Sequence, residues 1–219
     1  MSKLQEKVKL PSYTLGEELL NAISHGVGVL FSVAALVLTV VFSSIHGNPY
    51  AVVASCIYGS SLIILYSMST MYHSLKPNNA KRVFRILDHG SIFLLIAGTY
   101  TPYTLVTLNG WIGWTVFGIV WGCAALGITF KSIDINRFKK ISTIFYILMG
   151  WVILVAFKPL YEAIDIRGLY LLVAGGVIYT VGAIFYGIGK NKKYMHSIFH
   201  LFVLAASILQ FLSILLYVV

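Results

Sequence analysis

The chain has 219 residues, of which 58% are hydrophobic and only 11% are charged, and its mean hydropathy is +0.86. A soluble domain carries about 25% charged and roughly 45–50% apolar residues, so this composition excludes an ordinary soluble protein. The formal net charge of +9 would suggest nucleic-acid binding in a soluble protein, but the basic residues here fall in short loops between apolar segments, where they set membrane topology. We therefore expect the chain to reside in a lipid bilayer and to bind no nucleic acid.

Seven apolar segments follow one another, each long enough to cross a bilayer as a helix. A chain in hydrocarbon must satisfy its own backbone hydrogen bonds, and these segments lack the alternation of barrel strands, so they predict helices. Short turns join them, which favours one all-α, seven-transmembrane helix bundle. The expected spans are Leu19–Ser44, Tyr50–Ser74, Ile86–Thr107, Trp111–Phe130, Ile141–Phe157, Gly168–Ile188 and Met195–Val219.

Residues 1–18 form a short polar segment, which we expect in the cytoplasm ahead of a single transmembrane domain of residues 19–219. Within this segment, Thr14-Leu-Gly-Glu17 matches a capping box and predicts that a helix begins just before the first span. That span is too long for the core of a signal peptide, and no small-residue cleavage pattern follows it, so we expect it to be a retained helix.

The first span carries a polar stripe at its N-terminal end. Glu18, Asn21 and His25 stand at i, i+3 and i+7, which places them on one face of a helix. Such a stripe either supports a neighbouring site or forms a polar seam against another helix. The sequence favours neither interpretation over the other.

Polar residues also end the second span and open the third. Ser69 and His73 are four residues apart and therefore share a helical face, while Asp88 begins the third span. His89 lies about 100° around the helix from Asp88, so we expect it to point in another direction, toward the membrane interface.

Residues that break helices occur within the third span and between the fifth and sixth spans. In Gly98-Thr-Tyr-Thr-Pro102 the proline cannot donate a hydrogen bond to the Gly98 carbonyl, which predicts a kink in the third span. Lys158-Pro159 is expected to form the turn between the fifth and sixth spans.

The seventh span opens with His196-Ser-Ile-Phe-His200, which places two imidazoles one helical turn apart. This spacing alone arises often by chance. If the second and seventh helices approach each other, however, His73 adds a third neutral nitrogen, and three histidines with an open fourth position are typical of catalytic zinc. We therefore predict a Zn²⁺ site formed by these three histidines.

Asp88 and Ser69 are the residues expected to act beside that metal. The Asp88 carboxylate could orient or deprotonate a zinc-bound water, and Ser69 could hold the water or stabilise an oxyanion on a substrate carbonyl. The alternative is that all these groups are interfacial residues that bond to headgroups and water. Three histidines and an acid at one depth on three spans favour the metal.

The orientation follows from the distribution of positive charge. All of the 16 Lys and Arg residues except Lys158 and Arg167 fall on one side of the seven spans, and positive residues remain in the cytoplasm. The N-terminus is therefore expected inside and the C-terminus outside. The predicted metal site then lies roughly 5–10 Å inside the cytoplasmic boundary.

Taken in order, these motifs resemble the haemolysin III family, the bacterial branch of the progestin and adipoQ receptor family, in a wider superfamily that includes alkaline ceramidases. The resemblance covers essentially the whole chain and extends to the Glu18, Asn21 and His25 stripe and to Gly98-Thr-Tyr-Thr-Pro102. It implies seven spans with a cytoplasmic N-terminus. It also implies zinc bound by His73, His196 and His200, with Asp88 and Ser69 beside the bound water.

Three functions are compatible with these features. The leading hypothesis is a zinc-dependent hydrolase in the cell membrane, which cleaves an amide or ester of a membrane lipid with a metal-activated water. A second hypothesis is a pore-forming haemolysin that causes cytolysis, as the family name implies. A third is a sensor or regulator without catalytic activity, in which zinc clamps three helices and a lipid acts as ligand.

Overall fold

The protein is described by a computed structural model that covers residues 8–46, 48–189 and 192–219. Lys3, Lys7 and Lys190, which contribute to the charge count above, lie outside these residues. The described chain is all-α, as predicted. Its elements are α2 (Leu15–Ile45), α3 (Pro49–Ser74), α4 (Asn79–Pro102), the π-helix η1 (Tyr103–Leu108), α5 (Gly110–Ile133), α6 (Lys139–Gly150), the 3-10 helix η2 (Val152–Ala156), α7 (Phe157–Ala163), α8 (Ile166–Ile188) and α9 (Met195–Tyr217).

Within the described residues, seven helical segments of 23 to 31 residues are long and apolar enough to cross a membrane. The chain is thus a multi-pass membrane protein. The capping box is confirmed: the Thr14 hydroxyl accepts a hydrogen bond from the backbone N–H of Glu17 at 3.3 Å, and the Glu17 carboxylate accepts one from the N–H of Thr14 at 2.8 Å. The first helix consequently begins at Leu15, one turn ahead of the apolar segment.

The third and fifth spans change their backbone geometry partway, the third at η1 and the fifth at η2. Directly after Pro102 the third span continues as the π-helix Tyr103–Leu108, because the proline cannot supply the usual i→i−4 hydrogen bond. The expected turn at Lys158-Pro159 is wrong, since both residues lie in the first turn of α7. A proline is tolerated there because the first backbone N–H groups of a helix have no intrahelical acceptor.

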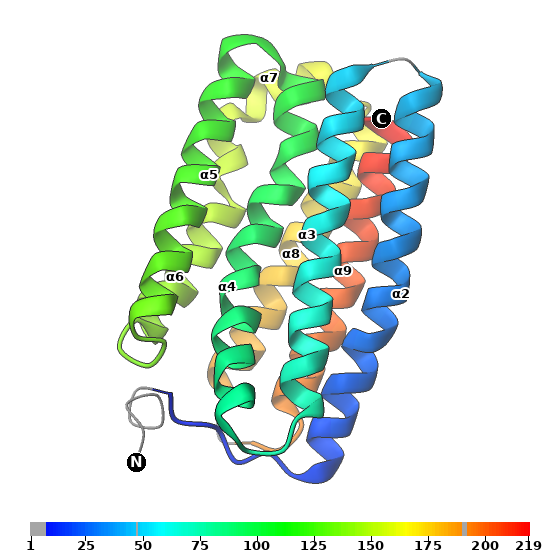
Figure 1. The fold of residues 1–219 in the computed structure, drawn as a ribbon. Helices are drawn as coiled ribbons and strands as arrows, with labels where there is room; N and C mark the ends of the chain where they lie inside the picture. The colour runs from blue at the N-terminus through cyan, green and yellow to red at the C-terminus, as the bar shows by residue number, and fades with distance from the viewer. Residues whose placement is uncertain (1–7, 47, 190–191) are drawn as a thin grey trace.

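The helices pack as one bundle (Figure 1), in which α3 lies between α2 and α4 while α9 packs against both α2 and α8. A glycine permits a close approach of α2 and α3: a Cβ at Gly59 would lie 2.6 Å from the Cβ of Leu36. Outward-facing apolar residues such as Leu30 and Val155 are 74% and 88% exposed, as expected for side chains that face lipid.

One end of the bundle, at the bottom of Figure 1, holds the polar motifs. The chain enters the bundle there, and the same end gathers the C-terminal ends of α3, α5 and α8 and the N-terminal ends of α4, α6 and α9. The segment before α2 is anchored across it, because the Arg85 guanidinium donates a hydrogen bond to the backbone carbonyl of Lys9. The fold therefore brings residues from distant parts of the sequence to one level of the membrane.

Candidate metal centre

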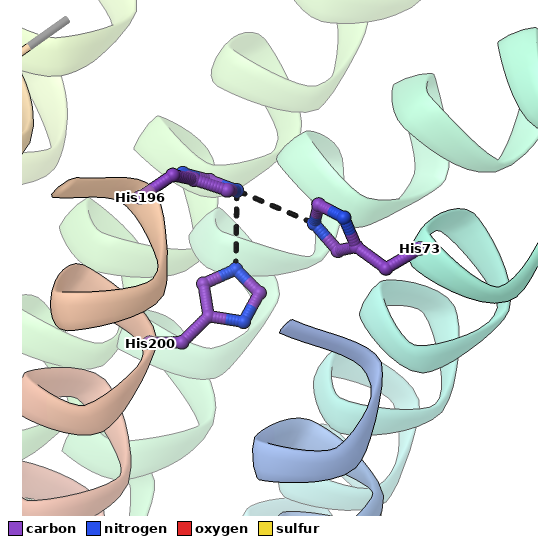
Figure 2. Close-up of side chains that lie close together, drawn as sticks. All are labelled: His73, His196 and His200. Carbon is purple, nitrogen blue, oxygen red and sulfur yellow. Dashed lines mark hydrogen bonds between the residues drawn. The ribbon is translucent and has the colours of Figure 1, made fainter. Parts of the chain in front are cut away.

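Three histidines from two helices meet at this end (Figure 2). His73 comes from the last turn of α3, and His196 and His200 come from the first two turns of α9. The His196 Nε2 atom lies 3.3 Å from the His73 Nε2 atom and 3.1 Å from the His200 Nε2 atom. All three side chains are buried, and one nitrogen from each lies within 4.8 Å of the others. The second and seventh spans thus approach each other at this end, which is the condition on which the metal site depended.

The geometry and the chemistry of these nitrogens fit a metal ion. Zinc–nitrogen bonds of about 2.0–2.1 Å at tetrahedral angles place neighbouring nitrogens about 3.3 Å apart, close to the distances observed here. In a neutral imidazole, the ring nitrogen that carries no proton offers a lone pair that a metal ion can accept. In addition, the Nδ1 atoms of His196 and His200 and the Ser69 hydroxyl are buried without a hydrogen bond of ordinary geometry to any described residue. The group could therefore hold a metal ion.

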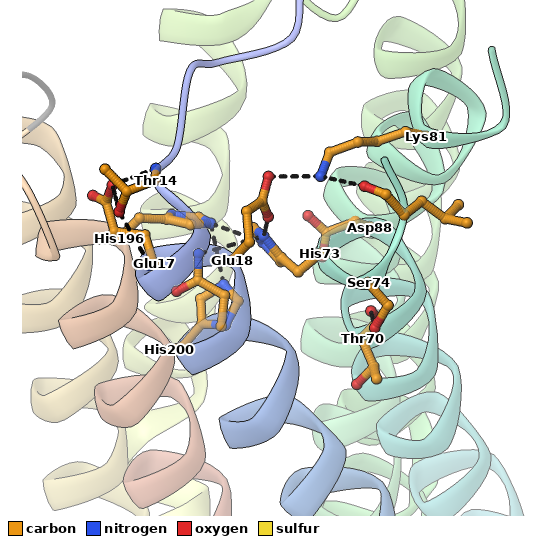
Figure 3. A network of polar contacts seen from close by, with 12 residues as sticks. Thr14, Glu17, Glu18, Thr70, His73, Ser74, Lys81, Asp88, His196 and His200 are labelled. Atoms are coloured by element: carbon orange, nitrogen blue, oxygen red, sulfur yellow. Dashed lines mark hydrogen bonds and ion pairs between the residues drawn. The ribbon is translucent and has the colours of Figure 1, made fainter. Parts of the chain in front are cut away.

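Glu18 fixes the orientation of His73 (Figure 3). Its Oε2 atom lies 2.7 Å from His73 Nδ1, and its Oε1 atom accepts a hydrogen bond from the Lys81 ammonium at 2.6 Å. Since a carboxylate can only accept a hydrogen bond, His73 Nδ1 must carry the proton. The Nε2 lone pair is then free to face the candidate metal centre, the space between the three histidines. A carboxylate behind a histidine in this way is a frequent support of metal ligands.

The other two residues of the polar stripe also contact the histidines. The Asn21 side-chain amide lies 3.3 Å from His73 Nδ1. The His25 ring stacks on the His200 ring, with centroids 3.6 Å apart and an interplanar angle of 14°. Between the two interpretations left open by the sequence, the geometry favours support of the histidines over a polar seam.

The third span begins at Asn79 and not at Ile86 as expected, so Asp88 lies in the third turn of α4, beside the histidines. Its partner is His89, for which the prediction from the sequence is wrong. His89 does not point away to the interface: its Nδ1 atom lies 3.3 Å from the Asp88 carboxylate and 3.0 Å from the Arg85 carbonyl oxygen. Side chains in a helix lean back toward its N-terminus, so the ring can reach the preceding turn and the neighbouring carboxylate. Both partners are acceptors, which means that Nδ1 donates to them.

Ser69 and Tyr13 complete the surroundings of the centre. Ser69 is fully buried one turn before His73, and its hydroxyl lies near the Asp88 carboxylate. Tyr13, which no sequence pattern singled out, stacks on His196 with centroids 5.2 Å apart and an interplanar angle of 8°. Burial raises the pKa of the Tyr13 hydroxyl, so this residue covers the centre as a neutral phenol.

A cavity of about 200 Å³ runs from the histidines into the bundle. At one end it is bounded by His25, Asp88, His89, His196 and His200. It continues between α4, α6, η2, α8 and α9 as far as Leu160 and Leu169, which lie near the opposite end of the bundle. The lining along this length is mostly apolar. The centre therefore communicates with a space suited to a hydrocarbon chain.

The sequence of the chain is similar to those of several known proteins. The chain is 46% identical over 215 residues to Hemolysin-3 of Bacillus cereus, covering 98% of both sequences, and 44% identical over 207 residues to the Hemolysin-3 homolog of Bacillus subtilis (strain 168), covering 94% of this chain and 97% of the relative. It is 26% identical over 209 residues to the human monocyte to macrophage differentiation factor, covering 92% and 84%. No solved structure matches. Residues 13–211, which include every residue of the candidate centre, match the haemolysin-III related family, so the chain belongs to that family.

Proposed function

We propose that this protein is a zinc-dependent hydrolase that cleaves an amide or ester bond of a membrane lipid in the cell membrane. The observation that carries the proposal is the shared cavity: three convergent histidines and a buried carboxylate lie at one end of a long apolar space. Hydrolysis of a lipid needs these two parts together, a polar centre for the scissile bond and an apolar space for the chain.

The three histidines would hold the metal through their Nε2 atoms. Bound zinc supplies Lewis acidity, which polarises a substrate carbonyl and makes water acidic enough to react near neutral pH. A structural zinc site is usually closed by a fourth protein ligand. Here His196 and His200 line the cavity, which favours catalysis over a structural clamp.

The remaining residues have roles that follow from their positions. Asp88 would accept the proton that water loses as its oxygen bonds to the carbonyl carbon, and His89 would hold the carboxylate in position. Ser69 would donate a hydrogen bond to the developing oxyanion. The proton then passes to the leaving amine or alcohol, and the products are a carboxylic acid and that amine or alcohol.

Activity against defined lipids tests the proposal. The purified protein is incubated with a panel of lipid amides and esters, and the released fatty acid is measured by mass spectrometry. We expect turnover of at least one lipid by the wild type and a loss of about 10²-fold or more in Asp88→Asn, because a general base typically contributes 10²–10⁴-fold. Asp165→Asn, at the opposite end of the bundle, should match the wild type. Zinc-loaded protein that cleaves no lipid of a broad panel would contradict the proposal.

Pore formation is the second candidate, and it rests on the name of the Bacillus cereus relative. Dye leakage from liposomes separates the two functions. If lysis follows from hydrolysis, His73→Ala should abolish zinc binding and leakage together. Leakage that survives in this variant would favour a pore.

A further inference from the structure

A second polar feature of the cavity is a buried lysine. Lys131 stands near the C-terminal end of α5, is only 2% exposed, and lines the cavity together with His196 and His200. A lysine at the cytoplasmic end of a span normally extends its ammonium into the headgroup region. Lys131 instead lies inside the protein, although its neighbours Ser132 and Ile133 are exposed.

In the part of the chain that the structure describes, the other two buried cations at this end have partners. Lys81 pairs with Glu18 and donates to the Leu75 carbonyl, and Arg85 donates to Lys9 and to the Asn136 side chain. Among the described residues, no acidic side chain forms an ion pair with Lys131. A buried ammonium without a counter-charge is costly, and an anionic ligand in the cavity would supply that charge.

Other cations near Lys131 increase the positive electrostatic potential in this part of the cavity. Arg85 and Lys139 act electrostatically on Lys131, and Lys139 lines the same cavity. Lys131 and Lys139 lie at the end of α5 and the start of α6, the same end of the bundle as the histidines. The cavity thus has an apolar length, a candidate metal centre and a cationic wall beside that centre.

We propose that the lipid bound in this cavity carries an anionic headgroup, a phosphate or a carboxylate, which Lys131 and Lys139 bind while the acyl chain occupies the apolar length. This inference rests on the proposed function and names the class of its substrate. A charge-assisted contact in a buried site is worth about a tenfold to hundredfold change in affinity.

Binding of matched lipids to the full-length protein in detergent tests the proposal. Oleoyl lysophosphatidate, oleate and mono-oleoylglycerol share one acyl chain, and the first two differ as phosphate and carboxylate. We expect the wild type to bind at least one of the two anionic lipids about ten- to hundredfold more tightly than mono-oleoylglycerol. Which of them is preferred identifies the headgroup.

Substitutions of single lysines then show which residue causes the preference for an anionic lipid. Lys131→Gln should remove the preference without weakening the binding of mono-oleoylglycerol, whereas Lys131→Arg should retain the preference. Lys139→Gln should reduce it, and Lys158→Gln, an exposed lysine at the opposite end, should leave it unchanged. Equal affinities for charged and neutral lipids in the wild type would overturn the proposal, and this comparison needs no variant. Undiminished preference in folded Lys131→Gln would overturn it as well.

The same assay separates this inference from the proposed function. His200→Ala removes a metal ligand but leaves Lys131 in place, so the preference for an anionic lipid should persist without zinc. A preference of this kind in a protein that hydrolyses no lipid would refute the hydrolase and leave the binding site. Hydrolysis without any preference would refute the binding site alone.

Discussion

At the scale of single residues, Glu18 links the candidate metal ligand His73 to Lys81 at the same end of the bundle. Its Oε2 atom lies 2.7 Å from His73 Nδ1, and its Oε1 atom accepts a hydrogen bond from the Lys81 ammonium at 2.6 Å. In Glu18→Gln a neutral amide replaces the carboxylate that accepts the hydrogen bond from His73, so His73 becomes a weaker ligand. We expect zinc affinity to fall about 10–100-fold, measured by competition with a chelator.

Glu162→Gln is the matched control for this prediction, because Glu162 is exposed at the opposite end of the bundle. Its zinc affinity should equal that of the wild type. Equal affinity in Glu18→Gln would mean that the carboxylate does not support a metal ligand.

The residues of the candidate centre differ in how far the sequence could predict them. His73, His196 and His200 were predictable because helical spacing and depth are properties of the sequence. His89 was assigned wrongly, because the angle between adjacent positions on a helix does not determine where a long side chain ends. Tyr13 and Lys131 could not be recognised, since stacking and burial depend on the packing of other segments.

At the scale of elements, the close contact between α2 and α3 depends on glycine at position 59, which has no side chain. A Cβ at Gly59 would lie 2.6 Å from Leu36 Cβ and 2.7 Å from its Cα, and a backbone atom cannot move aside without shifting the helix. Gly59→Ala should therefore destabilise the protein by about 1–3 kcal/mol, seen as a lower Tm in detergent. Gly118→Ala meets no atom within 4 Å and should keep the wild-type Tm or raise it.

The positions of the helices were largely predictable and their irregularities were not. Apolar length identified every span, because a helix in hydrocarbon must be apolar over about twenty residues. The sequence did not predict that the fifth span continues through Pro159 into α7. A proline indicates a turn unless it is known that a new helix begins just before it. The π-helix after Pro102 likewise depends on how neighbouring backbone groups are satisfied.

At the scale of the whole molecule, the distribution of Lys and Arg predicts a cytoplasmic N-terminus and an external C-terminus. Green fluorescent protein fused to the N-terminus should fluoresce, since it folds in the cytoplasm. Alkaline phosphatase fused to the C-terminus should be active, because it requires export. An inactive phosphatase together with a fluorescent C-terminal fusion of green fluorescent protein would place the C-terminus inside and contradict the prediction.

The central claim is that His73, His196 and His200 bind one zinc ion, and metal analysis of the purified protein tests it most directly. The wild type should contain about one zinc per chain, and His200→Ala should lose it. His46→Ala removes an exposed histidine at the opposite end of the bundle and should retain the metal. A wild type without bound metal, or a His200→Ala variant that keeps its full zinc content, would contradict the account.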